Sequence, residues 1–152
     1  MELGILVRST NCFQFGVSLF QGLLDLVVKT DITPTIFYHE NGAVPFKPEF
    51  TMLQSSQIWG FTGNMISVDY DTTRFMAECP TIKKKFFYVW NIEWTHDIQS
   101  YNSNHIAYHN DEIELISRST SHNGILTNTW KKPYAIMKDF NYETLEQIAK
   151  AS

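Results

Sequence analysis

Residues 3–38 read LGILVRSTNCFQFGVSLFQGLLDLVVKTDITPTIFY, and this stretch decides the fold. Leu3–Val7 is a short, nearly continuous apolar run, which is typical of a strand buried on both faces. After a polar loop that ends at Gly16, Val17–Lys29 has the apolar spacing of an amphipathic helix. Its apolar positions are Val17, Phe20, Leu23, Leu24, Val27 and Val28. Thr35–Tyr38 is the next strand, so the segment predicts a right-handed strand–helix–strand unit.

The same alternation continues to the end of the chain. Further strands are predicted at Met65–Val68, Phe86–Trp90, Glu114–Ser117 and Pro133–Met137. Helices are predicted within Phe50–Trp59, Arg74–Glu78, Asp97–His109, Asn123–Trp130 and Tyr142–Lys150, with Asp69–Thr73 and Asn141 as helix caps. We therefore expect one α/β domain over residues 1–152. Its Rossmann-like, doubly wound and mostly parallel sheet would carry helices on both faces.

Composition excludes several classes of protein. The chain has 152 residues, 43% of them hydrophobic and 18% charged, which is typical of a globular chain. The formal net charge is -4 and the longest basic run is Lys83–Lys85, which is best explained as a solvated edge, so charge alone does not predict nucleic-acid binding. Cys12 and Cys79 lie far apart and outside any CxxC pair, so neither a zinc site nor a disulfide framework is expected.

The start of the chain indicates where the protein works. Residues 1–7 lack the basic region of a secretory signal, and the apolar runs are far shorter than the roughly 20 residues that span a bilayer. With two unpaired thiols, this favours a cytoplasmic protein without a membrane partner, in the host cytoplasm if the protein is viral.

In an open α/β sheet, ligands gather outside the carboxyl ends of the strands. The first strand delivers Ser9, Thr10 and Asn11 to the start of a helix, whose backbone N–H groups could bind an anion or sugar oxygens; an ordinary polar turn is the alternative. The second strand ends at His39–Glu40, a pair suited to proton transfer or to a solvated loop.

The most unusual stretch is Tyr88-Val89-Trp90-Asn91-Ile92-Glu93-Trp94. Aromatic faces such as Tyr88 and Trp94 beside the Glu93 carboxylate suit a sugar ring or a nucleobase, whereas the alternative is a strand whose tryptophans fill the core. A carboxylate between two tryptophans needs a partner or a function. Arg118 follows a later strand, where it could bind a phosphate or satisfy carbonyl groups of the sheet.

Other candidate motifs are weaker. Asp69 and Asp71 have a spacing that can coordinate Mg²⁺, but a helix cap explains them better. The histidines form no ligand pattern, so we predict no metal site, and the sequence leaves any cofactor unidentified. The absence of GxSxG gives no support to a nucleophile-elbow hydrolase.

The order of these pieces carries a resemblance. A first strand runs into the polar, glycine-bearing loop Ile5–Gly16, and a later strand ends in the pair Ser117–Arg118. A helix to Trp130 and the apolar segment Lys132–Met137 follow, and Trp90–Trp94 precedes them. In this order the chain resembles the N-terminal half-domain of GT-B-type glycosyltransferases, including phage-encoded proteins of that sort.

The resemblance implies a sugar, nucleotide-sugar or acceptor ligand, with Glu93 or His39 as a base and Arg118 holding phosphate. In that family a second Rossmann-like domain holds most of the donor nucleotide, and this chain ends before one could begin. The resemblance therefore implies a half-domain that works with a separate protein partner, or a relative that has lost catalysis. The alternative function is a non-catalytic phage accessory protein that binds a host or structural protein.

Overall fold

The computed structural model describes all residues except 1, 12–14, 45–46 and 96–100. Cys12 and the first residues of the helix predicted within Asp97–His109 therefore lie outside the described residues. Within the described residues, one sheet of seven strands runs through the molecule, and all of them pair in parallel in the order β3-β2-β1-β4-β5-β6-β7. The strands are β1 (Glu2–Ser9), β2 (Thr33–Glu40), β3 (Thr51–Gln54), β4 (Asn64–Ser67), β5 (Lys84–Val89), β6 (Ile113–Ser117) and β7 (Ala135–Ile136). This confirms the predicted Rossmann-like, doubly wound α/β fold.

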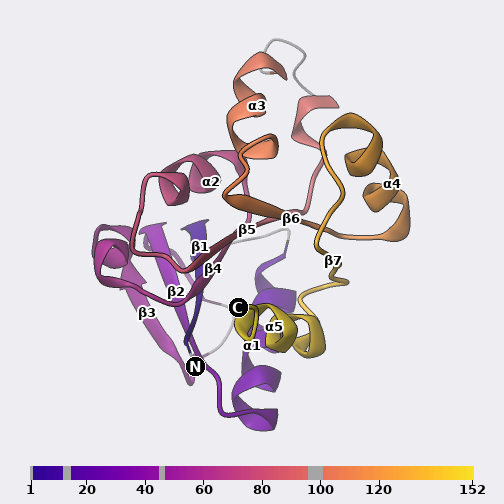
Figure 1. The fold of residues 1–152 in the computed structure, drawn as a ribbon. Helices are drawn as coiled ribbons and strands as arrows, with labels where there is room; N and C mark the ends of the chain where they lie inside the picture. Colours follow the sequence, from indigo (N-terminus) through magenta and orange to yellow (C-terminus); the bar gives the residue numbers. More distant parts are fainter. Residues whose placement is uncertain (1, 12–14, 45–46, 96–100) are drawn as a thin grey trace.

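Helices cover both faces of the sheet. They are α1 (Gly16–Lys29), α2 (Tyr70–Ala77), α3 (Tyr101–Tyr108), α4 (Thr120–Thr129) and α5 (Tyr142–Ala149), with the 3-10 helices η1 (Ser55–Gly60) and η2 (Glu93–Thr95). Figure 1 shows α1 and α5 together on one side of the sheet and α2, α3 and α4 on the other. The crossover from β1 to β2 runs along the sheet in one direction, and the crossover from β4 to β5 runs in the other. Because both crossovers are right-handed, α1 and α2 lie on opposite faces.

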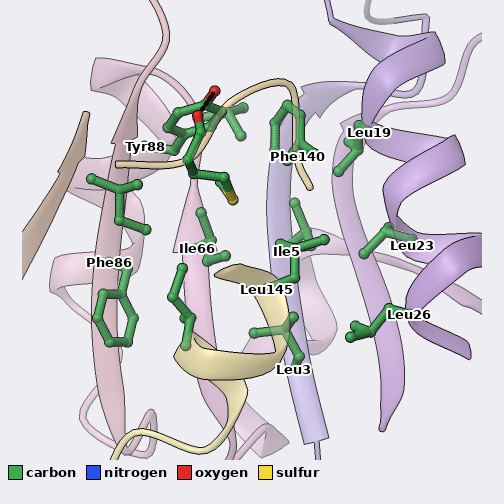
Figure 2. Packing of buried hydrophobic residues seen from close by; sticks show 14 of the residues in the cluster. Leu3, Ile5, Leu19, Leu23, Leu26, Ile66, Phe86, Tyr88, Phe140 and Leu145 are labelled. Atoms are coloured by element: carbon green, nitrogen blue, oxygen red, sulfur yellow. Dashed lines mark hydrogen bonds between the residues drawn. The ribbon is translucent and has the colours of Figure 1, made fainter. Parts of the chain in front are cut away.

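Each strand alternates its side chains between two hydrophobic layers. In β5, Phe86 and Tyr88 join the layer under α1 and α5, whereas Phe87 and Val89 join the layer under α2, α3 and α4. Figure 2 shows the first layer, where Leu145 of α5 and the leucines of α1 pack against the same face of the sheet. Burial on both faces explains the continuous apolar runs in the sequence.

Two expectations about local structure need correction. The segment Phe50–Trp59 does contain helical structure, the 3-10 helix η1, but its first half is the edge strand β3, which was not predicted. β3 is short and only half-buried, so it has no long apolar run that would mark it as a strand. In α1 the buried face centres on Leu19, Leu23 and Leu26. Val17 and Val28, which were predicted to belong to the apolar stripe, are exposed.

The helix caps follow the sequence more closely. Asp69 caps α2 by accepting from the backbone N–H of Thr72 at 2.8 Å, which confirms that this carboxylate is a helix cap. Ser119 caps α4 by accepting from the backbone N–H of His122 at 3.2 Å. Asn141 occupies the cap position of α5, but its side chain makes no capping hydrogen bond. Both α2 and α4 begin a few residues earlier than predicted because their caps lie earlier.

The amino edge of the sheet is occupied by structural contacts. The buried Asn64 side chain donates to the carbonyl oxygens of Ile148, Ala149 and Ala151 at the end of α5. Lys85, expected to be solvated, is instead buried, and its Nζ donates to the Ala77 carbonyl at 2.9 Å and pairs with Glu112 at 3.3 Å. None of the helices in the described part of the chain is long and apolar enough to cross a bilayer.

Candidate functional site

The carboxyl edge of the sheet is where the strand order reverses. β1 leads into α1 on one face, and its neighbour β4 leads into α2 on the other face. The loops after β1 and β4 therefore part in opposite directions, and this is the point at which doubly wound sheets bind their ligands. All the predicted site residues lie along this edge or just beyond it, because every strand points the same way.

The loop after β1 is tied to the loop after β2. Thr10 is buried, and its hydroxyl donates to the Gly42 carbonyl at 2.8 Å and accepts from the Gly42 N–H at 2.6 Å. The Asn11 N–H donates to Ser9 Oγ at 3.2 Å. A Cβ at Gly42 would lie 2.6 Å from that of Asn11, so the two loops are closely packed. Thr10 thus holds the loop in place, and Ser9 and Asn11 shape its turn.

His39 lies on the opposite half of the sheet from Glu93. It is exposed at the end of β2, its Nδ1 lies 2.7 Å from Ser55 Oγ, and its ring meets that of Phe75 edge-on at 5.0 Å. β2 and β5 are three strand spacings apart, or about 14 Å. The two predicted bases therefore do not form a pair that acts on one atom.

Glu93 lies against the start of α2. The residue is half-buried in η2, and its carboxylate accepts a hydrogen bond from the Tyr70 N–H. Burial and, to a smaller extent, the nearby carboxylates of Asp69 and Asp71 raise the pKa of Glu93 from its ordinary value to about 7, against the lowering effect of the Tyr70 N–H. A carboxyl group with a pKa near neutrality can both accept and release a proton at physiological pH.

The surroundings of Glu93 include a buried tyrosine that the sequence did not single out. Tyr108 is fully buried in α3, and its hydroxyl has no hydrogen-bond partner among the described residues. Burial and the charge of Glu93 both raise the pKa of Tyr108, which keeps its proton. Arg8 at the end of β1 approaches the same region, with its Nη1 3.9 Å from Asp71. The exposed Arg8–Asp71 pair is a weak contact by itself.

Tyr88 and Trp94 are buried on opposite sides of the sheet. Tyr88 is fully buried and donates its hydroxyl to the Met137 carbonyl at 2.7 Å. Trp94 is 8% exposed and packs edge-on against Tyr108 at 4.9 Å and Trp130 at 5.6 Å. In this structure neither residue presents an aromatic face to solvent, which fits the alternative of a strand whose aromatic residues fill the core.

Arg118 is held on the buried Trp90. Its guanidinium carbon lies 4.0 Å from the centre of the Trp90 ring, a cation–π contact. Trp90 also stacks on Phe140 at 5.9 Å and meets Phe15, at the start of α1, at 5.4 Å. No carboxylate among the described residues lies within ion-pair distance of Arg118. The guanidinium edges therefore remain available to a ligand.

The turn after β7 completes this neighbourhood. Asp139 and Phe140 have φ values of 49° and 55°, in the left-handed region that non-glycine residues rarely adopt. The buried Phe140 ring packs on Tyr88 at 4.8 Å, which fixes the turn against the core. Sequence reasoning missed this turn, because neither residue type marks a left-handed pair by itself.

Five of the predicted residues lie along one edge in three separate groups, whereas His39 lies beside Ser55 and Phe75, and Tyr88 and Trp94 are buried. Ser9, Thr10 and Asn11 lie with Gly42, Glu93 lies at the start of α2, and Arg118 lies on Trp90. In the part of the chain that the structure describes, no cluster of three or more histidine, cysteine, aspartate or glutamate residues could hold a metal ion.

Comparison of the chain with protein-family models, with curated proteins and with solved structures gives no significant match.

Proposed function

We propose that this chain is a glycosyltransferase-like domain that binds a sugar or nucleotide-sugar ligand at the carboxyl edge of its sheet. The observation that carries the proposal is Glu93, a half-buried carboxyl group with a pKa of about 7 beside the point where the strand order reverses. The order of the sequence pieces, which resembles the N-terminal half-domain of GT-B-type glycosyltransferases, supplies the reaction class.

In this proposal Glu93 is the general base. It takes the proton from an acceptor hydroxyl while that oxygen attacks the anomeric carbon of the donor sugar, and the nucleoside diphosphate leaves with the electrons of the broken bond. The Tyr70 N–H orients the carboxylate, and Asp69 and Asp71 keep its proton affinity high. A second nucleotide-binding domain, in this protein or in a partner, supplies most of the contacts to the donor.

A thermal-shift screen against nucleotide sugars and free sugars tests ligand binding. A ligand present at 100 times its dissociation constant should add about 2.7 kcal/mol of stability. Failure of every nucleotide sugar and sugar to raise the melting temperature would contradict the proposal and favour the alternative, a non-catalytic protein that binds a host or structural partner.

The Glu93→Gln variant tests the base. It keeps the size of the side chain but cannot accept the proton, so the rate of sugar transfer should fall by about 10²-fold or more while ligand binding is retained. The matched control is Glu78→Gln, because Glu78 is exposed and lies beyond α2, away from the carboxyl edge. Transfer at the wild-type rate in Glu93→Gln would exclude this role.

A further inference from the structure

We infer that the cavity between the start of α4 and the turn after β7 binds a phosphate group, with Arg118 as its main ligand. This inference rests on the proposed function for its choice of a phosphate-bearing sugar ligand. It adds the location of the charged group, which lies apart from Glu93.

The cavity has the size and position of a ligand site. It has a volume of about 470 Å³ and opens at the carboxyl ends of β6 and β7. Its lining residues are Arg118, Ser119, Thr120, His122, Ile136, Lys138 and Asp139. This volume exceeds that of a lone phosphate, so the rest of an esterified ligand, such as a sugar phosphate, can enter with it.

Arg118 is positioned to bind an anion before one arrives. Stacking on the buried Trp90 ring at 4.0 Å limits the orientations of the guanidinium, and no described carboxylate occupies its N–H edges. Asp139 lines the same cavity but lies beyond ion-pair distance of Arg118. An oriented guanidinium binds phosphate through two parallel hydrogen bonds, and little side-chain freedom is lost on binding.

The rest of the wall adds positive potential and hydrogen-bonding groups. Lys138 brings a second cation, so Arg118 and Lys138 together outweigh the single carboxylate of Asp139. Thr120 begins α4, so the first N–H groups of that helix lie beside Arg118. His122 also lines the cavity. Together these groups favour a doubly charged phosphate over a neutral sugar.

Two binding experiments test the inference. Calorimetry and NMR shifts of backbone amides measure the binding of pyrophosphate and of inorganic phosphate. The wild-type chain should bind pyrophosphate more tightly than inorganic phosphate, and neutral glucose should not shift the amides of residues 118–121. Arg118→Gln should weaken pyrophosphate binding by about tenfold or more, because a bidentate charged contact is lost. Lys138→Gln, at an exposed position where folding is not at risk, should weaken it by a smaller factor.

The matched control is Arg74→Gln. Arg74 is exposed on α2 and also lies over an aromatic ring, that of Tyr70 at 5.7 Å, but it does not line the cavity. The Arg74→Gln variant should bind pyrophosphate as tightly as the wild type does. The inference is overturned when neither phosphate compound binds, or when Arg118→Gln and Lys138→Gln both bind as the wild type does.

These outcomes are separable from those for the proposed function. Pyrophosphate binding that depends on Arg118, together with no sugar ligand and no transfer, would keep the phosphate site and reject the glycosyltransferase-like function. Sugar transfer that depends on Glu93 but is insensitive to Arg118→Gln and Lys138→Gln would keep the function and reject this cavity as the phosphate site.

Discussion

Glu93 makes the stability of the folded chain depend on pH. Its pKa is raised from 4.5 to about 7 by folding, so the unfolded chain releases this proton at lower pH than the folded chain does. The stability linked to the protonated form is therefore present below pH 4.5 and is lost as the pH rises to about 7. The loss is at most on the order of 3 kcal/mol, because Glu93 is only half-buried.

Glu93→Gln should remove this dependence. Urea unfolding of both proteins between pH 4.5 and pH 8 should show the wild type losing stability relative to the variant across the window that ends near pH 7. Glu78→Gln reports what the loss of an exposed carboxylate does by itself. A constant difference between wild type and Glu93→Gln at every pH would mean that folding does not raise this pKa.

The residues around Glu93 show how far the sequence could predict chemistry. A carboxylate between Trp90 and Trp94 stands out in the sequence, because such a group needs a partner. Its neighbours Tyr70 and Tyr108 come from helices on either side of it in the chain, and only the packing of α2 and α3 brings them to Glu93. Trp94 fills the core, which is the alternative that the sequence left open, because a strand end next to polar residues does not reveal which aromatic ring turns inward.

At the scale of elements, α1 packs so closely on the turn after β7 that no side chain fits between them at Gly22. A Cβ on Gly22 would lie 2.0 Å from the backbone carbonyl oxygen of Phe140. Gly22→Ala should therefore lower the free energy of unfolding by about 1–3 kcal/mol, because neither side can yield without moving the left-handed turn. Urea unfolding measures the change.

Gly124 is the control for the helix effect of this substitution. It lies inside α4, and a Cβ added there would meet no heavy atom within 4 Å, so Gly124→Ala should raise stability by up to about 1 kcal/mol. Equal stabilisation by both substitutions would show that α1 does not pack closely on the turn.

Helices and strands could be predicted from the sequence where the spacing of apolar residues matched the faces that are buried in the fold. Runs such as Leu3–Val7 and Phe86–Trp90 predicted strands because both of their faces are buried. β3 was missed because an edge strand buries little. The turn at Asp139 and Phe140 was missed because it is held by contacts with Gly22 and Tyr88, which are distant in the chain.

At the scale of the whole molecule, parallel pairing divides the sheet into two edges with different roles. The alternation of strands and helices was enough to predict that the candidate residues share the carboxyl edge. The alternation could not predict how far apart these residues lie along that edge, because it does not reveal the order of the strands in the sheet. In the structure, β1 and β4 lie between β2 and β5. His39 at the end of β2 and Glu93 after β5 are separated for this reason.

This division predicts where a ligand slows hydrogen exchange. Pyrophosphate should protect amides at 118–121 and 136–139, which flank the Arg118 cavity, and a nucleotide sugar should also protect amides at 68–71 and 91–94 beside Glu93. Amides at 62–64 and 83–85 lie at the amino edge, where Asn64 and Lys85 are already engaged by the protein itself, and should exchange unchanged. Protection confined to the amino edge would place the ligand at the wrong end of the strands, since the fold offers its diverging loops and the Arg118 guanidinium only at the carboxyl edge.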